Sequence, residues 1–162
     1  WVSLPGAAAQ VDCEDQYSAA VLADGRLFTW GANSHGKLGV GSVQDSHTPT
    51  EVRLGVLVSS VGLGSLYAGA VGRAGELFMW GYGGHGNLGL GNRRSTAVPV
   101  HVPFDEAVIQ VACTRGQDGC KGGLNPSSGG QEGPHTVVIT ASGNVYTFGT
   151  CHKGLLCNLG NK

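Results

Sequence analysis

The sequence lacks any stretch that could form an ordinary α-helix, because glycine or proline interrupts every window long enough for three helical turns. Charged residues are also scarce, at 13% of the chain, and the net charge of −1 offers no basic surface for DNA or RNA. No apolar run is as long as a membrane span. We therefore expect a β-rich chain that binds neither nucleic acid nor membrane.

The first residues lack the basic region and apolar core of a secretory signal, and there is no initiator methionine. The five cysteines are odd in number and unevenly spaced, which favours reduced thiols over a disulfide framework. We expect an intracellular protein, cytoplasmic or nuclear, and interpret the chain as a piece of a longer one. Its 162 residues correspond to one domain by length.

Familiar catalytic motifs are missing too. The chain has no Gly-x-Ser-x-Gly nucleophile elbow and no phosphate-binding loop with the required Lys-Ser/Thr. A zinc set would need paired ligands at short spacing, but its candidates are separated by five or six residues. These candidates are Cys113, Cys120, Cys151, His152 and Cys157. We predict no enzymatic activity, no cofactor and no metal.

Glycine is abundant, with 29 residues, and much of it lies in a stretch that occurs twice. The copies read DGRLFTWGANSHGKLGVG from residue 24 and AGELFMWGYGGHGNLGLG from residue 74. Corresponding residues are 50 apart, and a weaker third copy begins SGNVYTFG at residue 142. A fixed period of this size indicates a repeat architecture.

Each repeat contains short β-branched or aromatic segments around a turn. Segments 17–22, 67–72 and 135–140 end near Asp-Gly, Arg-Ala-Gly or Ser-Gly, and a second apolar segment follows at once. Both faces of this second segment are apolar, which predicts a strand sandwiched between layers. Several strands in about 50 residues are typical of a propeller blade. The chain divides into the end of a split repeat (1–25), a repeat (26–75), a longer repeat (76–143) and the start of another (144–162).

The longer repeat carries an insertion at 115–134. Gly75 and Gly143 are 68 residues apart, which is 18 more than the period. The extra residues are rich in glycine and serine, which is typical of a flexible loop.

This pattern resembles the regulator-of-chromosome-condensation repeat. The matching positions are the Trp-Gly strand end, the Asn-x-x-Gly-x-Leu-Gly-x-Gly loop and a following Tyr/His-Ser/Thr strand. The resemblance implies an all-β fold made of four-stranded blades of a β-propeller, normally seven-bladed. This chain holds about three repeat equivalents, so the remaining blades must come from the rest of the protein or from another chain.

The strand end common to all copies is expected to be structural. Large aromatic residues dominate protein cores, and the third copy replaces tryptophan with phenylalanine, which argues against the tryptophan-based light sensing known in the family. The positions expected to be structural are Trp30, Gly31, Trp80, Gly81, Phe148 and Gly149.

Candidate partner-binding residues lie in the loops. His35 and His85 occupy the same place in consecutive repeats, just before a loop glycine. Arg115, Asp118 and Lys121 belong to the insertion, and long loops carry function more often than short ones.

The predicted function is a non-catalytic protein-interaction or structural propeller segment of a larger protein or assembly. The resemblance adds two alternatives. One is a guanine-nucleotide exchange factor for a small GTPase, with the insertion as the only candidate for the loop that enters the GTPase. The other is the substrate-recognition propeller of a ubiquitin ligase. Fold alone does not choose among them.

Overall fold

The computed structural model describes residues 1–115 and 133–149. Six residues that the sequence singled out lie outside these ranges: Asp118, Lys121, Cys120, Cys151, His152 and Cys157. The described residues form three antiparallel sheets and one short 3-10 turn, η1 (Ser34–Gly36). The prediction of an all-β chain of propeller blades is confirmed.

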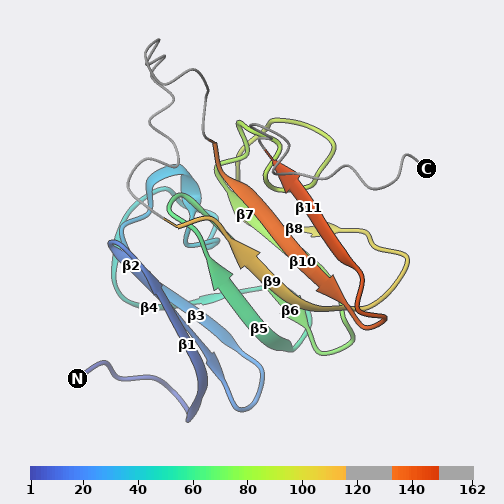
Figure 1. The fold of residues 1–162 in the computed structure, drawn as a ribbon. Helices are drawn as coiled ribbons and strands as arrows, with labels where there is room; N and C mark the ends of the chain where they lie inside the picture. The colour runs from blue at the N-terminus through green and yellow to red at the C-terminus, as the bar shows by residue number, and fades with distance from the viewer. Residues whose placement is uncertain (116–132, 150–162) are drawn as a thin grey trace.

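Each sheet is built from consecutive strands (Figure 1). The first holds β1 (Ala8–Glu14), β2 (Tyr17–Leu22), β3 (Leu27–Gly31) and β4 (Ser46–Val52). The second holds β5 (Val58–Leu63), β6 (Tyr67–Gly72), β7 (Leu77–Gly81) and β8 (Thr96–Val102). The third has three described strands, β9 (Val108–Cys113), β10 (His135–Thr140) and β11 (Val145–Gly149). We call these sheets blades 1, 2 and 3.

The blades are offset from the sequence repeat. Residues 26–75 supply β3 and β4 of blade 1 and then β5 and β6 of blade 2. Each repeat therefore links two blades, and residues 1–25 supply β1 and β2, which complete the first sheet.

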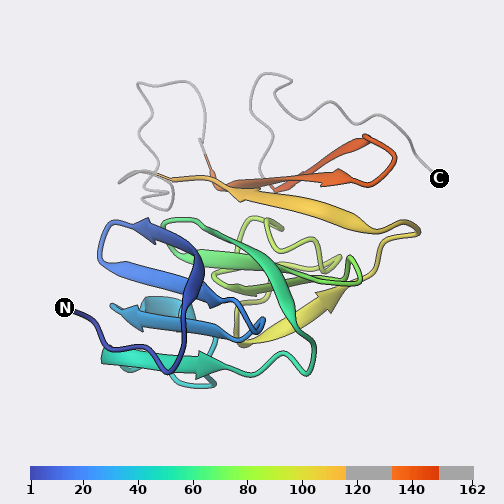
Figure 2. The same cartoon turned by 90° about the horizontal axis from the view of Figure 1, so that it is seen from below.

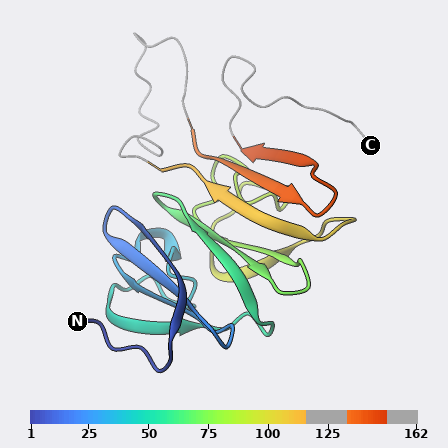
Figure 3. The same ribbon diagram turned by 60° about the horizontal axis from the view of Figure 1, so that its bottom comes forward.

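The blades stack face to face in chain order, with blade 2 between the other two (Figure 2). Strands β1, β5 and β9, the first of each blade, run side by side (Figure 3). Alternating side chains let one strand pack in both directions. In β7, Trp80 faces blade 1 and Leu77 and Met79 face blade 3, so the strand is sandwiched as its two apolar faces predict.

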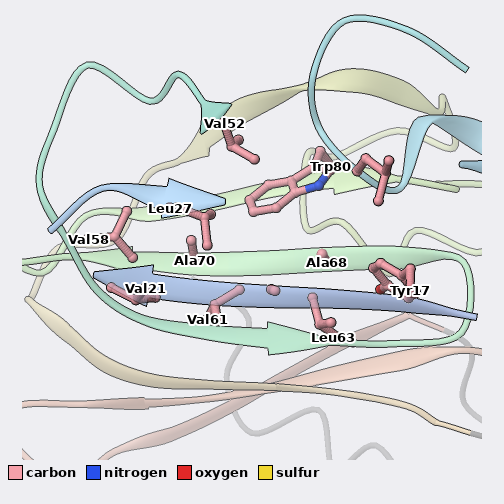
Figure 4. Packing of buried hydrophobic residues seen from close by; sticks show 12 residues of the cluster. Tyr17, Val21, Leu27, Val52, Val58, Val61, Leu63, Ala68, Ala70 and Trp80 are labelled. Atoms are coloured by element: carbon pink, nitrogen blue, oxygen red, sulfur yellow. The ribbon is translucent and has the colours of Figure 1, made fainter. Parts of the chain in front are cut away.

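Two apolar clusters fill the two spaces between blades. Between blades 1 and 2, Val61 and Leu63 of β5 pack with Tyr17 and Val21 of β2 (Figure 4). Between blades 2 and 3, Tyr67 and Val71 of β6 pack with Val138 of β10. The core of this molecule is therefore interfacial, because each blade is covered only by its neighbours.

Candidate interaction surface

A repeated tyrosine joins each blade to the next. The Tyr17 hydroxyl lies 2.5 Å from the Gly64 carbonyl oxygen and 2.9 Å from that of Tyr67, and it donates toward them. Fifty residues later, the Tyr67 hydroxyl donates to the His135 carbonyl oxygen at 2.5 Å and accepts from the Thr114 amide at 2.9 Å. Burial raises the pKa of both phenols, so both stay neutral donors.

The Trp-Gly position forms a second joint. Trp80 is fully buried, and its indole N–H donates to the Lys37 carbonyl oxygen of blade 1 at 2.9 Å. A Cβ added at Gly39 would lie 2.6 Å from that indole nitrogen, so the ring rests directly on the glycine. Phe148 of blade 3 meets Gly89 in the same way, with its ring 2.9 Å from the Cβ position.

Within residues 1–115 and 133–149, no blade packs on the outer side of blade 1, and the same positions are open there. Val61 and Val111 are 3% and 6% exposed, whereas the equivalent Val11 is 71% exposed. Trp30 is only partly buried, although the equivalent Trp80 is 0% exposed. We call the exposed side of β1 and β3 the open face; Val11, Cys13 and Trp30 lie on it.

Polar side chains of β1 bond to the backbone of β5. Gln10 pairs with both the amide and the carbonyl of Val61, at 3.1 and 3.0 Å, and the Leu63 amide donates to the Asp12 carboxylate at 2.9 Å. Blade 2 carries Ser60 and Gly62 at the matching positions. A Cβ at Gly62 would lie 2.7 Å from the Val111 carbonyl oxygen, so the second interface is closer and less polar.

Arg115, expected to bind a partner, forms ion pairs within the chain. Its guanidinium pairs with Asp12 and lies 3.9 Å from a Glu14 carboxylate oxygen. Arg115, the second residue after β9, therefore contacts β1, two blades away. Arg115 is still half exposed, at 52% of its side chain.

The His35 and His85 rings both contact Tyr82, a residue that the repeat pattern did not single out. The Tyr82 ring centroid lies 5.0 Å from that of His35 and 5.7 Å from that of His85, both in edge-on geometry. The two histidines come from adjacent blades, and Tyr82 follows β7 directly. His35 is exposed and has a positive φ of 60°, which places it at a sharp bend of η1.

Lys37 is a buried cation in the same loop. It is 3% exposed, its ammonium lies 4.5 Å from the Tyr17 ring centroid, and it donates to the Ser65 carbonyl oxygen at 3.3 Å. Burial lowers the pKa of its ammonium. Lys37 thus ties the blade 1 loop to blade 2 and is not available to a partner.

The described cysteines, Cys13 and Cys113, are free thiols. Within residues 1–115 and 133–149, no three His, Cys, Asp or Glu side chains gather as metal ligands do. That part of the chain also has no helix long and apolar enough to cross a membrane.

Comparison with known families accounts for the repeated joints. A family model for the Regulator of chromosome condensation (RCC1) repeat matches residues 24–71 and 74–117, and a related RCC1 model matches residues 8–37. The chain belongs to the RCC1 repeat family. Trp80, Gly39 and Tyr67 all lie in the matched RCC1 repeats, where they join one blade to the next.

One curated relative and two solved structures align with most of the chain. It is 35% identical over 152 residues to the probable E3 ubiquitin-protein ligase HERC3 of Homo sapiens, a match that covers 91% of this chain and 13% of HERC3. The crystal structure of human WBSCR16 matches with a TM-score of 0.75 and 24% identity, over 91% of this chain and 34% of that one. Prp20p from Saccharomyces cerevisiae matches with a TM-score of 0.65 and 23% identity, over 70% of this chain and 31% of its own.

The RCC1 chain described here spans only a fraction of each of these relatives, between 13% and 34% of their length. The two solved structures are less than 25% identical to this chain, so they show that it shares their fold.

Proposed function

We propose that residues 1–162 are a non-catalytic segment of an RCC1 propeller within a larger protein or assembly, and that their loops bind a protein partner. The observation that carries the proposal is the contrast between Val11, 71% exposed, and its equivalents Val61 and Val111, 3% and 6% exposed. Burying a valine is worth about 1.5–3 kcal/mol, so an open repeat position favours a further neighbour.

The positions of the exposed polar side chains support protein binding. Tyr17, Tyr67 and Lys37 are occupied in joining blades, whereas the loop residues His35, Arg93 and Arg94 are exposed. Loops on a rigid scaffold are the usual place for recognition. Prp20p, which shares the fold, has been characterised for binding to Gsp1p and histones.

Thiol labelling tests whether the open face is covered in the native protein. Cys13 lies on that face and is exposed in the 162-residue chain. Mass spectrometry identifies which cysteine has been labelled. We expect Cys13 to be labelled in the isolated chain, and to be labelled at least tenfold more slowly in the intact protein. Equal labelling rates in both would overturn the proposal that another blade covers this face.

A second candidate is the substrate-recognition propeller of a ubiquitin ligase. It is favoured by the 35% identity with HERC3 over 91% of the chain. The test is the sequence that flanks residues 1–162 in the same transcript, followed by a ubiquitin-transfer assay of the encoded protein. A flanking ligase domain with transfer activity would assign recognition to the propeller, and a transcript without one would remove this candidate.

Nucleotide exchange is the remaining alternative. Its candidate loop is the insertion 115–134, of which 116–132 lie outside the described residues. Release of a fluorescent guanine nucleotide from a panel of small GTPases measures it directly. The non-catalytic proposal expects the spontaneous rate, and accelerated release from any one GTPase would replace it with exchange activity.

A further inference from the structure

We propose that the loop between β7 and β8, together with His35 of blade 1, binds an acidic segment of a protein partner. The inference rests on the proposed function and names the chemistry of the partner. Five residues make up the surface, which we call the Tyr82 patch: His35, Tyr82, His85, Arg93 and Arg94.

The aromatic part of the patch spans two blades. Tyr82 contacts His35 and His85 edge-on, with ring centroids at 5.0 and 5.7 Å. The two loops are joined by a backbone hydrogen bond, in which the Gly41 amide of the blade 1 loop donates to the Ala97 carbonyl oxygen of β8 at 2.9 Å. A partner that lies on Tyr82 would therefore contact both blades at once.

The cationic part of the patch is Arg93 and Arg94. Both are exposed, and neither forms an ion pair with any residue in the described part of the chain. No aspartate or glutamate occurs between Glu76 and Asp105, so nothing in the loop neutralises them. Unpaired guanidinium groups suit carboxylates, which they bind through two parallel N–H donors.

The loop that carries the arginines is held by its own hydrogen bonds. The Arg94 amide donates to the Asn92 side-chain oxygen at 2.9 Å, and the Gly83 amide donates to the Ser95 hydroxyl at 3.2 Å. The Arg94 carbonyl oxygen lies against Gly83, next to Tyr82, so closely that a side chain at residue 83 would not fit. Arg93, Arg94, Tyr82 and His85 are therefore parts of one hydrogen-bonded loop, which lowers the entropy cost of binding.

The repeat does not require this charge. The matching residues of blade 1 are Val43 and Gln44, and they are followed by Asp45, whose carboxylate accepts from the Asn33 amide at 2.8 Å. Blade 1 thus builds the same loop with one acidic residue and no arginine. Blade 2 therefore differs from the repeat at an exposed loop tip. Arginine is not needed there for folding, and its exposed charge is available to a partner.

The patch favours an acidic protein segment over a nucleic acid. Val98 of β8, four residues after Arg94, is 50% exposed, and aromatic and arginine residues are enriched in protein interfaces. A nucleic-acid site would need a basic stripe, whereas the net charge of the chain is −1.

Fluorescence anisotropy can test the inference on the intact protein that contains residues 1–162. The probe is a labelled twelve-residue peptide of alternating glutamate and leucine, and its partner probe has glutamine in place of glutamate. We expect the glutamate peptide to bind at least tenfold more tightly than the glutamine peptide, and to bind more weakly as salt rises. Equal binding of both peptides would overturn the proposal.

Charge reversal then locates the site. Arg93→Glu should weaken glutamate-peptide binding at least tenfold, and Tyr82→Leu should weaken it severalfold. Arg53→Glu is the matched control, because Arg53 is exposed on the β4–β5 connection away from the patch, and it should change binding less than twofold. Equal effects of Arg93→Glu and Arg53→Glu would show non-specific attraction and sink the proposal.

A single-stranded RNA probe and the Cys13 labelling complete the design. RNA that binds as tightly as the glutamate peptide would overturn the assignment to a protein segment. If no peptide binds while Cys13 is protected in the intact protein, the patch inference fails and the propeller proposal stands. If the peptide binds and Cys13 is labelled equally in both forms, the reverse holds.

Discussion

At the scale of single residues, the two tryptophans of the Trp-Gly position form a matched pair. Trp80 is fully buried against Gly39 and donates to Lys37, whereas Trp30 is only partly buried. Trp80→Ala should lower the free energy of unfolding by about 3–5 kcal/mol, the range for truncating a buried aromatic residue. Trp30→Ala should cost less than half of that. Urea unfolding followed by circular dichroism measures both.

The result would also test the role given to Trp80. A well-folded Trp80→Ala protein with unchanged unfolding but lost peptide binding would make Trp80 a binding residue, against our structural interpretation. Equal costs for both tryptophans would mean that the open face is already covered in the isolated chain.

Glu106 gives a prediction about pH. Hydrogen bonds from Asn144, Ser142 and Tyr146 lower the pKa of its carboxyl to about 2. A lowered pKa means that folding stabilises the carboxylate form of Glu106 relative to the protonated form. Its stabilisation is therefore complete above the ordinary glutamate pKa, and it disappears as pH falls from about 4.5 toward about 2.

The matched variant is Glu106→Gln, which removes the charge at every pH. Amide exchange in the turn between β10 and β11 should be faster in Glu106→Gln than in wild type at pH 6. The two proteins should converge as pH falls toward 2. A gap that persists unchanged to pH 2 would contradict the pKa argument.

At the scale of elements, the sequence predicted the strands that combine apolar faces with a glycine turn. The bounds of β2, β6 and β10 agree with the predicted segments 17–22, 67–72 and 135–140. The outer strands β4 and β8 were not located, because each contains a proline, Pro49 or Pro99, and mixes polar with apolar residues. Both are edge strands, where proline is tolerated, so their pairing depends on the sheet rather than on local preference.

The candidate surface was predictable only in part. The period alone places His35 and His85 at equivalent positions, so a pair on adjacent blades could be expected. Tyr82 could not, because its contact with both rings depends on how the blades stack. The Arg115 ion pair with Asp12 joins residues 103 apart, and no local pattern links them.

The insertion gives the prediction for this scale. Thr114 and His135 flank it and are hydrogen-bonded to each other, with the Thr114 amide 3.1 Å from the His135 carbonyl oxygen. Because β9 and β10 already meet there, a shorter connection needs no rearrangement, and short loops cost less closure entropy. Deleting 116–133 should shift the unfolding temperature by less than about 3 °C, which is below 1 kcal/mol for a chain of this size. Differential scanning calorimetry measures the shift, and a fall of 10 °C or more would mean that the insertion packs on the blades.

At the scale of the whole molecule, three blades cannot close a ring, since propellers use at least about four. Blade 1 therefore keeps an open face, with Val11 71% exposed. Blade 3 ends the stack on the other side, where Val145 is 61% and Ile109 56% exposed. Exposed apolar blade faces and strand edges promote association. The central claim is that this RCC1 segment needs neighbouring blades to be covered.

Sedimentation velocity combined with small-angle X-ray scattering tests that claim most directly. The chain expressed alone should self-associate into soluble oligomers, with a sedimenting mass above that of a 16.5 kDa monomer. Val11→Lys should reduce self-association, because it places a charge on the open face, whereas Val61→Lys should unfold the interface between blades 1 and 2. A compact, monodisperse wild-type monomer would contradict the claim.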